Sequence, residues 1–336
     1  MIPKISILIA SYNAEKTIKR ALDSAINQTF KNIEIVCVND CSSDNTAKII
    51  KQYIKKDSRI KLINNKINLG ISMNRNVLIK NSRGEYFTFL DDDDQLDLKI
   101  CEEFVKRANG SGIKCDVAPF KSMVRFGSKG NIQFHNICSN NFNKNTTPIT
   151  FTEKNLFVPW GYFINRKYFL SLNKTFCPYA RTCEDLGFMP YVVLCTKKFM
   201  PIPKIGYYYY KVNTGKLSSI KKGKIDTLRD MLLQVDYLLD LSKKKGFLKD
   251  DKKLRAIFSA ISIGAGSFIS KYKIKFNNKQ TKIQKQKIKY EYMQMLHIKY
   301  DIPLDIYHNS WWKKFETIPQ TFSYWRQTKS IKQTKK

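Results

Sequence analysis

The chain has 336 residues and a formal net charge of +32 at pH 7, because 60 Lys and Arg outnumber 28 Asp and Glu. This length is ample for one domain of about 220 residues with its own core and a helical appendage. The longest uncharged stretch, residues 256–270, is too short and too rich in Gly and Ser to cross a bilayer by itself.

The strong positive charge raises the possibility of a nucleic-acid partner. However, Lys outnumbers Arg by more than four to one, and no RNA- or DNA-binding signature is present. Readout of base edges favours Arg. We therefore expect no nucleic-acid partner, and a genome rich in A and T would explain much of the Lys excess.

Cysteine usage and the N-terminus both favour the cytoplasm. The eight cysteines form no C-x-x-C pair, and Cys37, Cys101 and Cys195 lie in apolar runs, as buried thiols do. This pattern predicts a reducing compartment and no zinc site. Glu15 and Lys16 interrupt the first apolar run, so we expect no signal peptide.

The first hundred residues alternate apolar runs with helical patterns. Residues 5–10 form an apolar run, and the apolar positions of residues 18–26 recur at helical spacing, with Asn13 as the expected N-cap. The pattern repeats over residues 33–54 and over residues 60–80, and residues 86–90 form a fourth run. Such alternation predicts right-handed crossovers and an α/β fold, with a parallel sheet covered on both faces.

Polar side chains follow three of these runs. They are Ser11, then Asp40, and then four adjacent carboxylates, Asp91, Asp92, Asp93 and Asp94. A solvated turn that caps the next helix is one interpretation of the acidic run. Ligands of parallel sheets bind beyond the carboxyl ends of the strands, so the convergence of three polar clusters at one edge favours a binding site.

The phosphate-binding motifs with glycine-rich loops are absent. Neither G-x-G-x-x-G nor G-x-x-x-x-G-K-[ST] occurs, so a bound phosphate would need another counter-charge. A divalent metal held by Asp91 or Asp93 would supply it. Hard oxygen ligands suit Mg²⁺ or Mn²⁺, which proteins often hold with one or two carboxylates plus substrate phosphates.

Two stretches carry a resemblance to a known family. "ISILIASYNAEKTIKRALDSAINQTFKNIEIVCVNDCSSDNTAKII" and "NLGISMNRNVLIKNSRGEYFTFLDDDD" resemble the nucleotide-sugar-binding half of family 2 glycosyltransferases. The resemblance is dense over residues 4–108 and thinner to about residue 220. It implies a GT-A (Rossmann-like) fold, an α/β architecture with a mostly parallel central sheet and helices on both faces.

The second turn departs from the family pattern. The family usually reads Asp-Gly-Ser there, whereas this chain has Asp40, Cys41 and Ser42. Cys takes a left-handed backbone conformation less easily than Gly, so the turn geometry is open.

The resemblance implies roles for the residues of the nucleotide side. It places Ala10, Ser11 and Tyr12 along the base and ribose, and Asp40 as the acceptor of a hydrogen bond from the base N–H. Arg75, in "MNRN", would lie close to the nucleotide. A surface helix residue is the alternative for Arg75.

The same resemblance divides the acidic run. Asp91 would bind the ribose or a metal-bound water, and Asp93 would bind the metal that bridges the two phosphates. Asp92 is a further donor-side candidate. For Asp92 and Asp94 a purely structural role is the alternative.

A second acidic pair, Glu184 and Asp185, precedes an apolar helical run in "YARTCEDLGFMPYVVL". A helix start stabilised by its dipole is one interpretation. The family places the catalytic base of inverting members at the second position of such a pair, which implies Asp185, with Glu184 as the second choice. It also places Trp160 and Gly161 near the acceptor, although core packing explains Trp160 equally well.

Residues 221–336 differ in character from residues 1–220, which we expect to form the catalytic domain. They contain helical patterns and 27 Lys and Arg against 10 Asp and Glu. Trp311, Trp312, Tyr324 and Trp325 lie among basic residues, which suits an anionic membrane surface. The alternative is that this basic, mainly helical region docks on the catalytic domain.

These features together predict an inverting, metal-dependent transferase of a hexose or N-acetylhexosamine. The expected donor is a UDP-sugar, and the expected acceptor is a hydroxyl of a glycan, free or lipid-linked, in bacterial surface polysaccharide, lipooligosaccharide or glycoprotein glycan synthesis. The expected location is cytoplasmic, with peripheral attachment to the inner membrane. A nucleotidyltransferase and a non-catalytic nucleotide- or nucleic-acid-binding protein with the same fold are the alternatives.

Overall fold

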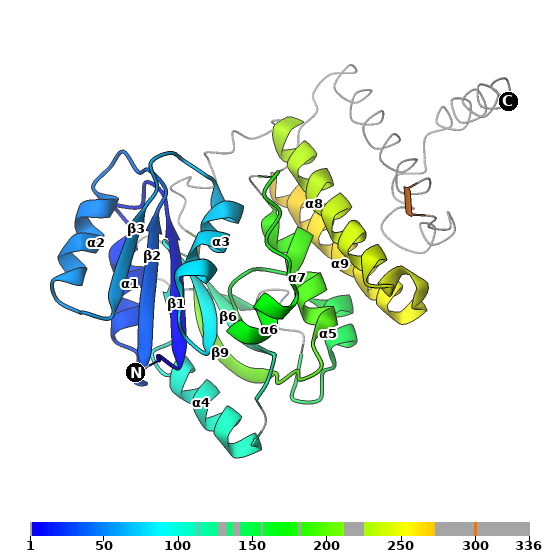
Figure 1. The fold of residues 1–336 in the computed structure, drawn as a ribbon, viewed down its shortest axis with the longest axis horizontal. Coiled ribbons are helices and arrows are strands. Elements are labelled where there is room, and N and C mark those ends of the chain that lie inside the picture. The colour runs from blue at the N-terminus through cyan, green and yellow to red at the C-terminus, as the bar shows by residue number, and fades with distance from the viewer. Residues whose placement is uncertain are drawn as a thin grey trace, which may run out of the picture.

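The structure is a computed structural model. It describes residues 2–112, 114–126, 133–136, 142–155, 157–180, 183–211, 225–272 and 299–300. Within these residues a nine-stranded sheet has the order β3-β2-β1-β4-β8-β6-β9-β5, and β7 pairs with β6 outside this path. Helices pack around the sheet, and a pair of long helices lies at the side away from β3 (Figure 1).

The N-terminal half of the sheet is parallel, as predicted. Its strands are β1 (Ile5–Ser11), β2 (Ile33–Asn39), β3 (Ile60–Asn64) and β4 (Tyr86–Asp91). β1 and β2 are almost completely buried, which is typical of parallel strands covered on both faces. The register pairs Ser11 with Asn39, and Ala10 with Asp91, so the polar strand ends meet at one edge.

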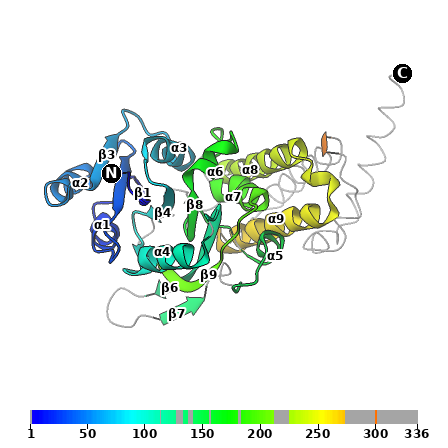
Figure 2. The same ribbon diagram turned by 60° about the horizontal axis from the view of Figure 1, so that its bottom comes forward.

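Four helices connect these strands or follow them, namely α1 (Ile18–Ile26), α2 (Thr46–Ile54), α3 (Ile71–Asn81) and α4 (Ile100–Ser111). α1 and α3 lie on opposite faces of the sheet (Figure 2). The prediction that Asn13 caps the first helix is wrong, because α1 begins after Thr17. Asn13 instead takes a positive φ of 49°, and its side chain accepts a hydrogen bond from the Ser43 N–H.

The second half of the sheet is mixed rather than parallel. Its strands are β5 (Gln95–Leu96), β6 (Val117–Phe126), β7 (Gln133–Asn136), β8 (Tyr162–Asn165) and β9 (Ile202–Lys211). β8 runs antiparallel to β4 and β6, whereas β6 and β9 are parallel. The short β5 pairs antiparallel with β9, so the chain directly after the acidic run lies against a strand more than a hundred residues later.

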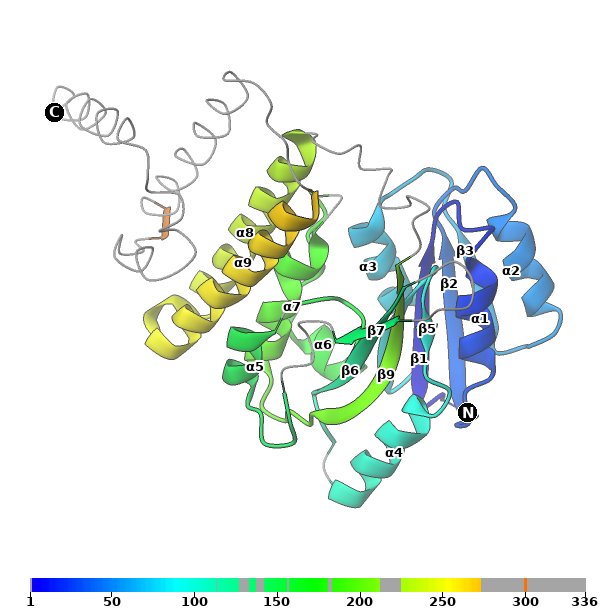
Figure 3. The same cartoon turned by 180° about the vertical axis from the view of Figure 1, so that it is seen from behind.

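The remaining helices form one side of the molecule. They are α5 (Pro148–Lys154), α6 (Arg166–Ser171), α7 (Glu184–Cys195), α8 (Ile225–Lys244), the 3₁₀ turn η3 (Phe247–Lys249) and α9 (Asp251–Tyr272). Figure 3 shows α8 beside α7 and α9 beside α5, which are also pairs in contact. The contact between α7 and α8 is close, since a Cβ on Gly187 would lie 1.9 Å from Oε1 of Gln234.

Residues 225–272 share their core with the preceding sheet domain. Leu238 of α8 and Ile257 of α9 are fully buried and belong to the same apolar cluster as β1 and β4. The predicted domain boundary at residue 220 and the aromatic tail after residue 300 lie outside the described residues, so both stay predictions. Among the described residues, no helix combines the length and the apolar composition needed to cross a bilayer.

Candidate functional site

The loops after β1 and β2 bind each other at the carboxyl edge of the sheet. The Asp40 N–H donates to the Ser11 carbonyl at 2.8 Å, and the Asn13 N–H donates to Oγ of Ser42 at 3.0 Å. The Ser11 hydroxyl is buried and has no hydrogen-bond partner in the described part of the chain. Tyr12 is 46% exposed beside it, and Ala10 is partly buried. A ligand at this edge would therefore meet one unsatisfied hydroxyl and one open aromatic ring.

Asp40 is buried and ties its loop to the start of α3. Its Oδ1 accepts from the Leu69 N–H at 2.8 Å and from Nδ2 of Asn65 at 2.9 Å, and its Oδ2 accepts from the Gly70 N–H at 3.0 Å. A carboxylate has about four acceptor sites, so one remains for a base N–H. The predicted contact with the base stays a prediction.

Cys41 takes a left-handed backbone conformation at the position where the family pattern has Gly. Its φ is 59°, and its side chain is exposed. A non-glycine residue in this region costs on the order of 1–3 kcal/mol. The turn that the sequence left open is therefore left-handed at Cys41, at some cost in stability.

The acidic run forms a tight turn with three outer carboxylates and one inner carboxylate. The Asp94 N–H donates to the Asp91 carbonyl at 3.2 Å, and Oδ2 of Asp92 accepts from the Tyr12 N–H at 3.1 Å. Asp91, Asp92 and Asp93 are half-buried at the edge, whereas Asp94 is fully buried. Burial and the neighbouring Asp93 and Asp91 raise the pKa of Asp94 well above its usual range. A fully solvated turn is thus wrong for Asp94.

Arg75 joins the two acidic clusters. Its side chain is only 3% exposed; Nη1 donates to Oε1 of Glu184, and Nη2 donates to Oδ1 of Asp91 at 3.2 Å. Its guanidinium also lies 5.4 Å from the ring centre of Phe89. Burial lowers the pKa of Arg75, and the Asp91 and Asp185 carboxylates oppose this shift. The surface-residue interpretation of Arg75 is therefore wrong.

Glu184 and Asp185 begin α7 but differ in their contacts. The Glu184 carboxylate is buried against Arg75, whereas Asp185 is half-buried and its Oδ1 accepts from the Leu186 N–H at 2.8 Å. Burial raises the pKa of Asp185, Arg75 opposes the rise and Asp91 adds to it. Asp185 therefore lies within electrostatic range of the acidic turn, and a raised pKa suits a proton acceptor.

Trp160 and Gly161 lie behind the acidic turn. Trp160 is 5% exposed, and its ring stacks on Tyr207 with 4.1 Å between ring centres and an interplanar angle of 5°. Gly161 has a φ of 88°, and its carbonyl accepts from the Phe120 N–H at 2.8 Å. Core packing thus accounts for the Trp160 ring, and contact of either residue with an acceptor stays a prediction.

Sequence reasoning missed several residues of β9 and α1 that hold the turn. Tyr207 and Tyr210 contact Asp94, and Arg20 donates to the Asp93 carbonyl. The run "YYYY" in β9 was the available signal, but Tyr207 and Tyr210 lie three positions apart and face opposite sides of the strand, and Tyr210 binds Asp94 through its backbone N–H. Nothing in the sequence shows which carboxylate they bind.

The acidic turn has the donor chemistry for a divalent metal. In the described residues no group of three or more His, Cys, Asp or Glu side chains is arranged to hold a metal ion. The half-buried carboxylates of Asp91, Asp92 and Asp93 offer hard oxygen donors at one edge. Mg²⁺ and Mn²⁺ suit such a partial set when substrate phosphates supply further ligands, so the residues fit the predicted metal.

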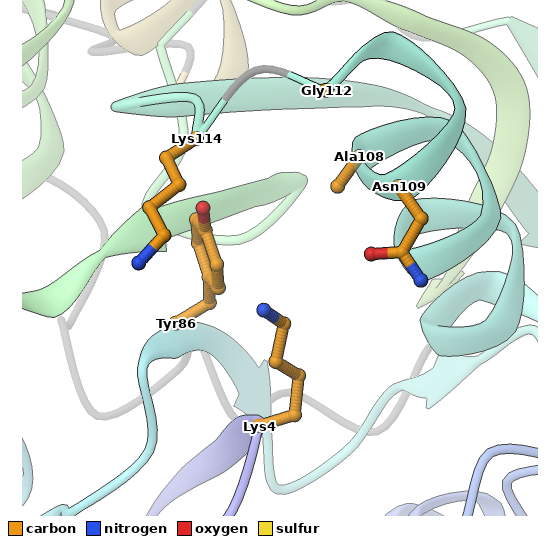
Figure 4. A pocket seen from close by; sticks show the side chains of 6 residues that line it. All are labelled: Lys4, Tyr86, Ala108, Asn109, Gly112 and Lys114. Carbon is orange, nitrogen blue, oxygen red and sulfur yellow. The ribbon is translucent and has the colours of Figure 1, made fainter.

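A cavity of about 410 Å³ lies at the opposite edge of the sheet. Figure 4 shows Lys4 and Lys114 reaching toward the space beside Tyr86, which begins β4. Lys4 pairs with Glu85 at 2.7 Å, and Lys114 lies 3.9 Å from the same carboxylate. This cavity is separate from the carboxyl edge that carries the predicted site residues.

Comparison with known proteins identifies the family. Residues 6–171 match the family model of glycosyl transferase family 2. These residues form a domain of this family. All predicted donor, metal and acceptor residues lie within this match, and Glu184 and Asp185 follow it.

Two curated relatives illustrate the match. Glycosyltransferase GlyA of Streptococcus pneumoniae is 30% identical over 227 residues, which cover 65% of this chain and 32% of GlyA. The Escherichia coli protein WfaP, a UDP-Glc:alpha-D-GlcNAc-diphosphoundecaprenol beta-1,3-glucosyltransferase, is 46% identical over 90 residues, which cover 27% of this chain and 35% of WfaP. The chain thus spans about a third of the length of these relatives.

A solved structure shows the same fold. Staphylococcus aureus TarS 1–349, in complex with UDP-GlcNAc, superposes with a TM-score of 0.68 at 22% identity. The superposition covers 87% of this chain and 81% of the TarS chain. The predicted GT-A fold is therefore confirmed.

Replacement of Arg75 tests its place between the two acidic clusters. Arg75→Met should lower the free energy of unfolding by about 3–5 kcal/mol, because it leaves Glu184 buried without its cation. Arg83→Met is the matched control, since the Arg83 side chain is 64% exposed and should change stability by less than about 1 kcal/mol. Urea denaturation measures both. An Arg75→Met variant as stable as Arg83→Met would contradict the buried contact.

Proposed function

We propose that the chain is an inverting, metal-dependent glycosyltransferase that moves a hexose or N-acetylhexosamine from a UDP-sugar to a hydroxyl of a glycan. One observation carries the proposal: a buried guanidinium, Arg75, binds both the strand end that bears Asp91 and the helix start that bears Asp185. The proposed donor-binding residues and the proposed proton acceptor, Asp185, would thus lie at one edge of a family 2 domain. The UDP-GlcNAc in TarS and the UDP-Glc named for WfaP support a UDP-sugar donor.

The donor nucleotide would lie across the first two loops. Ala10, Ser11 and Tyr12 would line its base and ribose, and the free Ser11 hydroxyl supports this position. Asp40 has an acceptor site left for the base N–H. The protein donors already bound to Asp40 hold it rigidly, which favours recognition of one base over adaptation to several.

The acidic turn would hold Mn²⁺ or Mg²⁺ together with the diphosphate. Asp93 is the proposed metal ligand, Asp91 would bind the ribose or assist at the metal, and Asp92 would lie on the donor side. When bound, the metal would neutralise charge that develops on the departing diphosphate. Arg75 already neutralises part of the charge on Asp91, which leaves Asp92 and Asp93 as the stronger ligands.

Asp185 is the proposed general base. The acceptor hydroxyl would lose its proton to Asp185 as its oxygen attacks the anomeric carbon from the face opposite the diphosphate, which inverts that carbon. Glu184 is less suited because its carboxylate is bound to Arg75. A nucleotidyltransferase would use the metal carboxylates but would not need Asp185.

The acceptor class follows from the relatives only in outline. WfaP is named for a diphosphoundecaprenol-linked acceptor, which supports a growing bacterial surface glycan on a lipid carrier. Lipooligosaccharide and glycoprotein glycans are the related choices. Trp160 and Gly161 remain the proposed acceptor-side residues, and the Trp160 ring itself stacks on Tyr207.

Asp93→Asn tests the metal role. The substitution should abolish turnover of UDP-sugars and the Mn²⁺-dependent part of UDP binding, because an amide is a much weaker ligand than a carboxylate, and it should leave the melting temperature unchanged. A screen of nucleotide sugars for hydrolysis, with and without Mn²⁺, provides the assay. Wild-type turnover in Asp93→Asn, or turnover without any divalent metal, would contradict the proposal.

Asp185→Asn separates binding from chemistry. Transfer should fall by about 10²–10⁴-fold, while nucleotide affinity stays near wild type. Glu184→Gln is the comparison variant, which tests whether the base is the neighbouring residue Glu184 instead of Asp185. Loss of transfer in Glu184→Gln but not in Asp185→Asn would move the base to Glu184, and normal transfer in both would leave the pair as a helix start.

The pKa direction of Asp185 adds two expected results. Burial raises the pKa of Asp185, and a protonated Asp185 could not accept the proton of the acceptor hydroxyl. As the pH is lowered, transfer should therefore begin to fall at a higher pH than it would with an unperturbed Asp, whose pKa is about 3.9. A raised folded-state pKa also means that stability decreases as pH rises from the unfolded pKa through the folded one. Asp185→Asn removes this effect, so it should not lower the free energy of unfolding at pH 7.

The basic tail is a separate proposal. Trp311, Trp312 and Trp325 among lysines would attach the enzyme to the cytoplasmic face of an anionic membrane. Truncation after Ser310 should release the protein from anionic liposomes in co-sedimentation, and binding of the full chain should weaken above about 0.1 M salt. Donor hydrolysis should persist. Equal pelleting of both proteins would leave the tail as packing for the catalytic domain.

A further inference from the structure

The hydroxyl of Tyr207 bridges the two ends of the acidic turn. It donates to Oδ2 of Asp94 at 2.7 Å and accepts from the Asp91 N–H at 3.2 Å. Tyr207 and Asp94 are both fully buried. One oxygen atom from β9 thus fixes the first and the last residue of the run, which lie 116 and 113 residues before it in the chain.

The Tyr207 hydroxyl is itself held in place. Its ring stacks on Trp160 with 4.1 Å between ring centres, and β9 pairs with β5 directly after the turn. The second oxygen of Asp94 accepts from the Tyr210 N–H at 2.8 Å. Both carboxylate oxygens of Asp94 are therefore bound to the same strand.

The middle of the turn is supported from the other side. The Arg20 guanidinium lies 3.8 Å from the ring centre of Tyr210 and donates to the Asp93 carbonyl. This contact engages the backbone carbonyl of Asp93. Asp92 and Asp93 thus keep their half-buried side chains at the edge while the backbone beneath them is fixed.

Burial of a carboxyl group at this point costs free energy, so its presence calls for an explanation. Asp94 lies next to three further carboxylates, and an apolar side chain would fill the same volume without desolvation of an acid. The arrangement is explained if the turn must keep one backbone conformation when a metal and a diphosphate bind to it. Second-layer hydrogen bonds of this kind orient metal ligands in many sites.

We propose that Tyr207 and Asp94 are positioning residues that hold Asp91 and Asp93 in the geometry that binds the metal and the diphosphate. The inference rests on the proposed function of the acidic turn. The inference also explains the role of the Trp160 ring, because its stack on the Tyr207 ring fixes the direction of the Tyr207 hydroxyl.

Tyr207→Phe tests this inference, because it removes the bridging oxygen and keeps the ring on Trp160. Affinity of the full chain for Mn²⁺, measured by electron paramagnetic resonance with and without UDP, should fall by about 10–100-fold. UDP-sugar hydrolysis should show a raised requirement for Mn²⁺ and recover at high Mn²⁺. Tyr208→Phe is the matched control, since its hydroxyl bonds Asp97 at 3.2 Å rather than the acidic run, and it should bind Mn²⁺ like the wild type.

The outcomes separate the inference from the proposed function. If the wild type binds no Mn²⁺ with UDP, the metal role of the turn fails. If the wild type binds Mn²⁺ and Tyr207→Phe binds it equally well, only the positioning role is overturned, even where the melting temperature falls. If Tyr207→Phe does not fold, Asp94→Asn decides: about tenfold weaker Mn²⁺ binding than the wild type supports the role, and equal binding overturns it.

Discussion

The site depends on the two ion pairs that the buried guanidinium of Arg75 forms with Asp91 and Glu184. This guanidinium is placed by α3, it binds the carboxylate at the end of β4, and it binds the first residue of α7, 109 positions later in the chain. Removal of either acid would leave a buried cation with one partner, and removal of the cation would leave a buried acid. The end of β4 and the start of α7 therefore keep a fixed spacing through one charged side chain.

Glycosyl transfer gives this spacing a chemical meaning. In the proposed inverting transfer, the attacking hydroxyl and the departing diphosphate would lie on opposite sides of one carbon, so an error in the distance between the proposed base and the proposed metal site would slow the reaction. Arg75 fixes the strand end and the helix start relative to each other. Tyr207 and Asp94 fix the acidic turn relative to β9.

Much of the fold and part of the site could be predicted from the sequence. The parallel strands followed from apolar runs, and the convergence of Ser11, Asp40 and Asp91 followed from the rule that parallel strands end at one edge. The resemblance supplied Asp185, and the structure places it within electrostatic range of Asp91. Local patterns were informative because these features depend on neighbours in the chain.

Features that depend on distant segments could not be predicted. No local pattern shows that Arg75 meets Glu184 or that Asp94 turns inward to Tyr207. Asn13 fits the composition of an N-cap, yet a contact with the second loop holds it before the helix begins. The antiparallel addition of β8 also comes from tertiary pairing with β4 and β6.

A crystal structure of the full chain grown with Mn²⁺ and UDP tests the central claim most directly. The account predicts a metal bound to the Asp93 carboxylate and to the diphosphate, the uracil near Asp40, and Arg75 still in contact with both Asp91 and Glu184. UDP bound elsewhere, for example beside Lys4 and Lys114, or a diphosphate held at the carboxyl edge without Asp93, would contradict it.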